Sequence, residues 1–94
     1  MEKQILETVQ LINKVNKFLD YKDFDFDFED VMETIKGSQE RFSSFIDEFK
    51  KTDLDDKDKI NNLMVHIELE YSNFVWAFQE IRDFIKRTLV KYPD

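Results

Sequence analysis

The final third of the chain carries an unbroken helical pattern of apolar residues. Between residues 58 and 92, apolar side chains recur at intervals of three and four positions, which is the period of one face of an α-helix. The residues of this stripe are Ile60, Leu63, Met64, Ile67, Tyr71, Phe74, Val75, Phe78, Ile81, Ile85, Leu89 and Tyr92. The pattern predicts one amphipathic helix over about residues 56–91, roughly 50 Å long at 1.5 Å per residue. We expect Asp53 or Asp55 to cap its start.

Two shorter helical patterns precede this helix. Residues 2–19 carry an apolar stripe that Leu11 and Phe18 widen to more than half of the circumference, so we expect this helix to contact two neighbours. Asn16 lies inside the stripe, where it either fixes the register of packing or, as we expect, reaches water at the edge of the face. Residues 29–50 carry a narrower stripe, with acidic residues in the first turn and lysines in the last, and these charges suit the helix dipole.

The segment between the first two helices has a different period. Residues 23–28 read Asp-Phe-Asp-Phe-Asp-Phe, and such alternation puts the Phe side chains on one side of an extended backbone and the Asp side chains on the other. No other segment has a strand-like pattern with which it could pair. We therefore expect residues 20–28 to form an extended acidic and aromatic linker rather than part of a sheet.

The relative lengths of the helices decide how they pack. An antiparallel pairing of the second and third helices puts the start of the second helix opposite Phe78, so the last turns of the third helix extend beyond it. The linker can cover these turns with its Phe side, while its Asp side reaches the cations Arg82, Lys86, Arg87 and Lys91. The predicted fold class is all-α, a single-domain antiparallel three-helix bundle with a long C-terminal helix. The alternative is a four-helix bundle, which requires the third helix to break near Ser72–Asn73.

Composition narrows the class of protein further. One Gly and one Pro among 94 residues supply too few turns for a many-stranded sheet, which agrees with an all-α fold. The lack of Cys excludes a disulfide framework, and a formal net charge of -7 disfavours direct binding to nucleic acid. No segment resembles a signal peptide or a membrane span, so we expect a cytoplasmic protein with no membrane partner. The abundance of Lys, Asn, Ile, Phe and Asp is typical of an AT-rich genome, such as that of a low-GC bacterium or its phage.

The linker aspartates only partly match a calcium-binding loop. Asp23, Asp25 and Asp27 occupy the first three ligand positions of an EF-hand. Phe28 then stands where the loop needs Gly, and Thr34 stands where it needs a bidentate Glu. The sequence therefore does not predict a calcium site.

Other residues that commonly carry chemistry form no recognisable set. His66 and Glu70 are spaced to share one helix face, yet a single His with no Cys provides too few ligands for a transition metal. The sequence has no nucleophile elbow and no phosphate-binding loop. We therefore expect no catalytic, cofactor-binding or metal site, and no enzymatic activity.

Two sets of residues remain as candidate binding surfaces. The first is Val65, Leu69 and Trp76, which lie roughly 140° to 180° from the centre of the long apolar stripe, on the side that should face water. Trp is enriched at binding hot spots, so this set is the predicted contact with another protein or with a second copy of the chain, unless the first helix or a bend buries it. The second set is the acidic surface Asp20, Asp23, Asp25 and Asp27, whose carboxylates could imitate a nucleic-acid backbone.

Together these features predict a non-catalytic protein-binding module. The function we expect is that of a small intracellular inhibitor, immunity protein or adaptor that occupies the surface of a partner protein. One alternative is an acidic nucleic-acid mimic that inhibits a nucleic-acid-binding protein through the linker. The purely structural alternative for the same linker is that it packs on the end of the third helix as an intramolecular clamp. A second alternative is a helical secretion or assembly chaperone.

Overall fold

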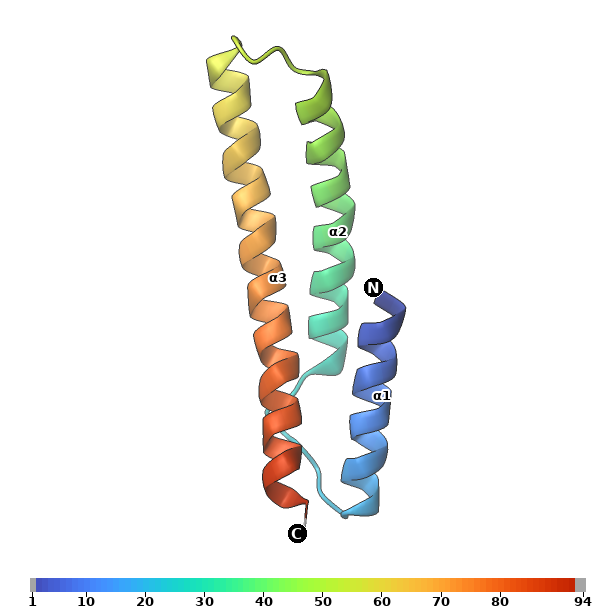
Figure 1. Cartoon of the computed structure of the whole chain (residues 1–94). Helices are drawn as coiled ribbons and strands as arrows, with labels where there is room; N and C mark the ends of the chain where they lie inside the picture. Colours follow the sequence, from blue (N-terminus) through green and yellow to red (C-terminus); the bar gives the residue numbers. More distant parts are fainter. Residues whose placement is uncertain (1, 93–94) are drawn as a thin grey trace.

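Three α-helices account for most of the chain. A computed structural model describes residues 2–92, with helices α1 (Glu2–Phe18), α2 (Phe28–Lys51) and α3 (Lys57–Lys91). Figure 1 shows that α2 and α3 form a long antiparallel hairpin and that α1 runs beside the half of this hairpin nearer to the C-terminus. The predicted all-α three-helix bundle with a long C-terminal helix is confirmed. Because α3 is continuous, the alternative break near Ser72–Asn73 is wrong.

Local hydrogen bonds explain where α2 and α3 begin. The carboxylate of Asp27 accepts a hydrogen bond at 3.0 Å from the backbone amide three residues further on, so it caps α2. Asp56 caps α3 in the same way at 3.3 Å. Asp56 is therefore the cap of α3. The sequence suggested Asp53 or Asp55 for this position, and that prediction was wrong.

The end of α1 is closed by a Schellman motif. The Tyr21 amide donates to the Asn16 carbonyl at 2.9 Å, and the Asp20 amide donates to the Lys17 carbonyl at 3.2 Å. Asp20 has a φ of 53° and so takes the left-handed position that Gly usually fills, which a short polar side chain tolerates better than most. The motif turns the chain from α1 towards α3, where the linker begins.

The hairpin packs along a seam with a heptad repeat. On each helix, the residues that face the partner follow one another at alternating intervals of three and four positions, as in a coiled coil. They are Phe28, Val31, Ile35, Ser38, Phe42, Phe45 and Phe49 on α2, and Ile60, Leu63, Ile67, Glu70, Phe74, Ala77 and Ile81 on α3. The same spacing continues on α3 with Phe84 and Thr88, which contact the linker and α1 instead. All of these residues are buried or partly buried.

The seam on α3 is narrower than the stripe expected from the sequence. Six residues of that stripe are substantially exposed, namely Met64, Tyr71, Val75, Phe78, Leu89 and Tyr92. They flank the seam, and α2 alone is not wide enough to cover them. Their assignment to the core was therefore wrong.

The buried core is confined to one half of the hairpin. A single cluster contains Val9, Val31, Ile35, Ala77, Ile81 and Phe84, where all three helices meet. With 17 residues against 35 in α3, α1 is too short to cover the whole hairpin. We call residues 39–75, beyond the start of α1, the open half, and the remainder the closed half. Within the open half, Leu63 is the one apolar side chain that is fully buried.

The linker covers the end of α3, where α2 has not yet begun. The ring of Phe26 stacks on that of Phe84 with centroids 4.1 Å apart, and Arg87 Nε donates to the Asp23 carboxylate at 2.7 Å. The expected clamp of the linker on α3 is thus present. The linker does not keep all of its Phe side chains on the side that faces α3, because Phe24 is exposed.

The face that α1 buries is narrower than expected. Leu11 and Phe18 are exposed, so the predicted widening of the stripe was wrong. Asn16 is buried, and its side-chain oxygen accepts a hydrogen bond at 2.9 Å from the Thr88 hydroxyl of α3. The expectation that Asn16 reaches water was also wrong, because it lies on the line where α1 meets α3.

Candidate protein-binding surfaces

The predicted contact residues lie on the outer side of α3. Val65, Leu69 and Trp76 are each partly exposed, and we call them the outer stripe. The first helix does not bury them, because α1 lies beside the half of the hairpin that contains neither Val65 nor Leu69, and Trp76 at the border between the halves is still 40% exposed (Figure 1). A bend of α3 does not bury them either, because the helix is continuous. The three residues therefore form an accessible apolar strip in the open half and at its border.

A second apolar surface was missed by the sequence interpretation. It is a groove of about 360 Å³ beside the start of α1. Its lining consists of Ile5 from α1, Ile35, Gln39 and Phe42 from α2, and Tyr71, Phe74, Val75 and Phe78 from α3. Gln39 is the one non-aromatic polar residue in this lining. A heptad count along α3 could have revealed the groove, because Tyr71, Val75 and Phe78 all lie beside the seam positions.

Contacts between aromatic rings hold the side chains at the base of the groove in place. Phe42 packs edge-on against Tyr71 and Phe74, with centroid distances of 5.4 and 6.0 Å. The Phe74 ring also stacks near that of Phe78 at 6.4 Å. Rings held in such offset and edge-on arrangements attract one another beyond the effect of burial alone. The groove is therefore preformed in the single chain.

The other side of the seam carries a polar cluster. Arg41 Nε lies 3.0 and 2.9 Å from the two carboxylate oxygens of Glu70, and the Asn73 amide donates to the same carboxylate at 3.1 Å. Arg41 Nη2 also donates to the Ser38 hydroxyl at 3.2 Å. The hydrogen bond from Arg41 lowers the pKa of Glu70, while burial of the carboxylate acts in the opposite direction. The hydrogen bond to Glu70 in turn raises the pKa of Arg41.

The four aspartates of the predicted acidic surface are in different environments. Asp20 and Asp25 are exposed, and Asp27 uses its carboxylate to cap α2. The Asp23 side chain is 3% exposed, with one oxygen bonded to Arg87 and the other to the Asp25 amide at 2.9 Å. Asp23 is therefore not a surface group, and the four carboxylates do not project together into solvent.

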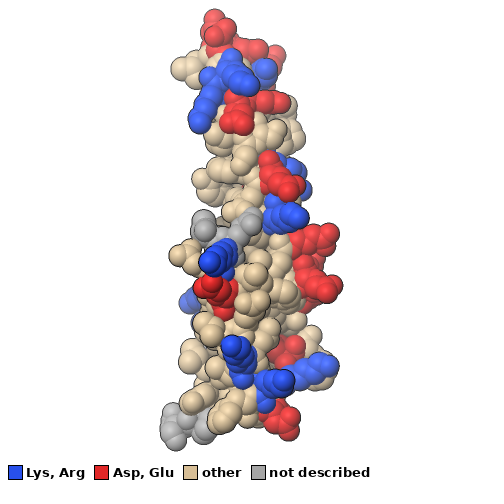
Figure 2. All heavy atoms as spheres, turned by 90° about the vertical axis from the view of Figure 1, so that its right-hand side faces the viewer, with Lys and Arg blue, Asp and Glu red and all other residues tan. Residues whose placement is uncertain are grey.

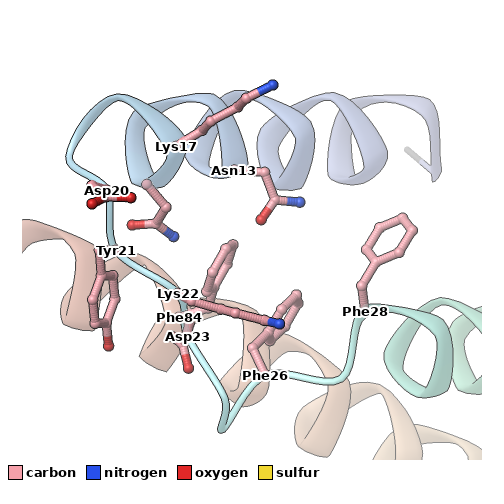
Figure 3. A pocket seen from close by; sticks show the side chains of 10 residues that line it. Asn13, Lys17, Asp20, Tyr21, Lys22, Asp23, Phe26, Phe28 and Phe84 are labelled. Atoms are coloured by element: carbon pink, nitrogen blue, oxygen red, sulfur yellow. The ribbon is translucent and has the colours of Figure 1, made fainter.

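A polar cavity of about 440 Å³ lies between α1, the linker and α3. Figure 3 shows Asn13 pointing from α1 towards the cavity. Lys22 and Phe26 of the linker also line it, and the Lys22 ammonium lies 5.1 Å from the centre of the Phe24 ring. The other residues that line it are Asn16, Lys17, Asp20, Tyr21, Asp23, Phe28 and Phe84. The cavity thus combines amide, ammonium and carboxylate groups with an aromatic floor of Phe26 and Phe84.

Charged side chains of both signs are spread along the molecule. Figure 2 shows, on the face that carries α1, acidic and basic groups from one end to the other with uncharged surface between them. They crowd together at the end formed by the turn between α2 and α3. The negative net charge is therefore not gathered into one patch on this face.

The remaining residues that could carry chemistry are His66 and the acidic side chains. His66 stacks on the ring of Phe45 with centroids 5.0 Å apart. Within residues 2–92, no three His, Asp or Glu side chains converge closely enough to hold a metal ion. Over the same residues, no helix is long and apolar enough to cross a membrane.

Comparison with known proteins identifies no relative of the chain. It matches no protein-family model, and it has no significant similarity to a curated protein sequence or to a solved structure. Its geometry is that of a three-helix bundle in which half of a helical hairpin has no third helix beside it (Figure 1).

Proposed function

We propose that the protein is a non-catalytic binding module that occupies the surface of another protein through the outer stripe. The observation that carries this proposal is the exposure of Val65, Leu69 and Trp76 on the outer side of α3. A solvated helix face is normally polar, and apolar surface that the chain itself does not cover is typical of interaction sites. A small intracellular inhibitor, immunity protein or adaptor works in this way.

Trp76 is the expected anchor of the contact. Aromatic residues dominate binding hot spots, because they bury a large apolar area while losing little side-chain entropy. Leu69 and Val65 lie about two and three turns before Trp76 along roughly the same side of the helix, so the three residues together can fill an apolar depression on a partner.

The test compares two matched substitutions on α3. Leu69 in the outer stripe is 55% exposed and Val75 in the groove is 54% exposed, so Leu69→Glu and Val75→Glu introduce the same charge at equal exposure. The tagged wild-type protein and both variants are used to capture partners from the cells that make the protein, with helix content checked by circular dichroism. We expect Leu69→Glu to weaken capture of the specific partner more than tenfold, because it places a charge in a desolvated contact.

Val75→Glu should leave capture of that partner intact, because it lies roughly 120° away from Leu69 around the helix. A partner held equally well by Leu69→Glu and the wild type would overturn the proposal. Loss of the partner from Val75→Glu alone would transfer its binding site to the groove.

A further inference from the structure

The groove is the exposed beginning of an apolar surface that runs along the open half. In the closed half, α1 covers this side of the hairpin as far as Ile5. Beyond that point the same side continues with Tyr71 and Met64, both exposed, and no other element of the described chain lies over it. The lining of the groove contains no charged side chain. Such a surface has the composition of the centre of a protein interface.

The accessible surface area of the chain indicates how much of its surface a partner would have to bury. One chain exposes 7257 Å². A compact monomer of 11.5 kDa is expected to expose about 5,800 Å². The excess is roughly 1,450 Å² per chain, so two copies that covered it would bury roughly 2,900 Å², which is within the range of permanent homodimers.

The shape of the chain fits a second copy of itself. The molecule measures 59 × 20 × 19 Å, and α1 adds a single helical layer over roughly 25 Å of it. In the open half this layer is absent over a similar length, roughly 27 Å, so the surface has a step next to the start of α1. When two copies lie antiparallel with their open halves face to face, the step of each receives the hairpin end of the other. Such a closed two-fold arrangement uses the same surface on both subunits.

The turn between α2 and α3 supplies a residue suited to the groove. Leu54 stands in this turn, is 79% exposed and makes no use of its apolar side chain within its own chain. The antiparallel overlap brings the turn of one copy to the start of α1 in the other, where the groove lies.

We propose that two copies of this chain pair antiparallel through their open halves, with Leu54 of each copy in the groove of the other. The open halves then form a four-helix bundle at the centre of a longer rod. The outer stripe stays on the outside of this bundle, so the inference concerns a different surface from the proposed function and does not rest on it.

The first test uses exposed loop residues, whose substitution leaves the fold of the single chain unchanged. Leu54→Asp is compared with Phe24→Asp, a matched control that is 84% exposed in the linker at the other end of the molecule. Sedimentation equilibrium at about 100 µM should give the wild type and Phe24→Asp twice the 11.5 kDa of one chain. Leu54→Asp should raise the dissociation constant more than tenfold. Val75→Glu should do the same, and Leu69→Glu should not.

The second test measures the length of the dimer by small-angle X-ray scattering. Two chains of 59 Å that overlap by their open halves should give a longest dimension of about 90 Å. A dimer of about 60 Å, in which the chains lie side by side along their full length, would overturn the proposal. A wild type that remains monomeric at about 500 µM, or a dimer weakened equally by Leu54→Asp and Phe24→Asp, would also overturn it.

Discussion

Individual polar residues interrupt the apolar seams of this bundle at defined places. Thr88 of α3 has its hydroxyl oxygen 2.9 Å from the Asn16 side chain and 3.1 Å from the Phe84 carbonyl. This buried polar pair between two helices is satisfied in one register only, because a shift by one turn would leave the buried Asn16 side-chain oxygen without its partner, whereas Thr88 could still donate to the Phe84 carbonyl of its own helix. Asn16 and Thr88 therefore fix the position of α1 along α3. Glu70 and Arg41 do the same for α2 and α3.

Arg41→Ala should destabilise the protein at neutral pH. In the wild type the pKa of Glu70 is lowered, so the ion pair contributes stability above the ordinary Glu pKa of about 4.3, and this stability is lost as the pH falls through the folded value. Arg41→Ala removes the largest of the causes that lower the pKa of Glu70, while the burial that raises it remains, so the variant lacks the stability that Arg41 supplies above this pH. Urea unfolding at several pH values should show a gap between wild type and variant that is large at pH 7 and shrinks towards pH 4.

The control for this prediction is Glu70→Leu. Leu at this seam position is apolar and helix-forming, and it leaves behind an Arg41 side chain that is 53% exposed and can be hydrated. Because Glu70→Leu removes the buried charge and the remaining Arg41 charge can be hydrated, this variant should lose less stability than Arg41→Ala at pH 7. An equal loss of stability in both variants at all pH values would contradict the asymmetry between the buried carboxylate and the exposed guanidinium.

At the scale of whole elements, the linker acts as a short substitute for a helix. The last turns of α3 have no α2 beside them, since α2 begins at Phe28. Phe26 and Asp23 take its place, one by stacking on Phe84 and the other by pairing with Arg87. The hydrogen bond to Asp23 raises the pKa of Arg87, so the guanidinium of this pair stays charged.

Phe26→Ala should cost about 2 to 3 kcal/mol in the free energy of unfolding. This is slightly less than the loss of about 3 to 5 kcal/mol for a fully buried Phe, because Phe26 is only partly buried. Phe24→Ala is the matched control two residues away, and its exposed ring should change stability by no more than about 0.5 kcal/mol. Denaturant unfolding measures both. Similar losses for the two variants would mean that the linker does not pack on α3 as described.

On the scale of the whole molecule, the two halves differ in how they are stabilised. The radius of gyration is 17.7 Å, compared with about 12 Å for a compact domain of this length. The closed half contains the buried cluster of three helices, whereas the open half is a two-helix hairpin whose seam aromatics are only partly buried. A hairpin without a third layer opens more readily than the rest of its domain.

Amide hydrogen exchange in dilute monomeric protein should reveal this difference. Amides of the open-half seam, such as those of Phe45 and Leu63, should exchange at least about tenfold faster than those of Val31 and Ala77, which corresponds to an opening free energy lower by about 1.4 kcal/mol. The Leu54→Asp variant serves as the monomeric reference if the wild type associates. Uniform protection along α3 in the monomer would show instead that both halves unfold as one unit.

Much of the fold could be predicted because it rests on local properties. The limits of the three helices, the linker at residues 20–28 and the continuous α3 follow from the period of the apolar residues, from acidic capping positions and from the lack of Gly and Pro within α3. The accessible position of Leu69 on the outer side also followed, because the angle between two positions on one helix depends only on their spacing.

Burial was decided by which helix lies beside which segment. The sequence shows that Tyr71, Val75 and Phe78 are apolar and share a face, but their exposure results from the shortness of α1 and from its place beside the other half of the hairpin. Asn16 and Asp23 moved in the opposite direction, from expected water contact to burial, because Thr88 and Arg87 lie opposite them more than 60 positions away in the chain. Helix periodicity is set within a few residues, whereas the third layer that buries or exposes a face is set by contacts between distant segments.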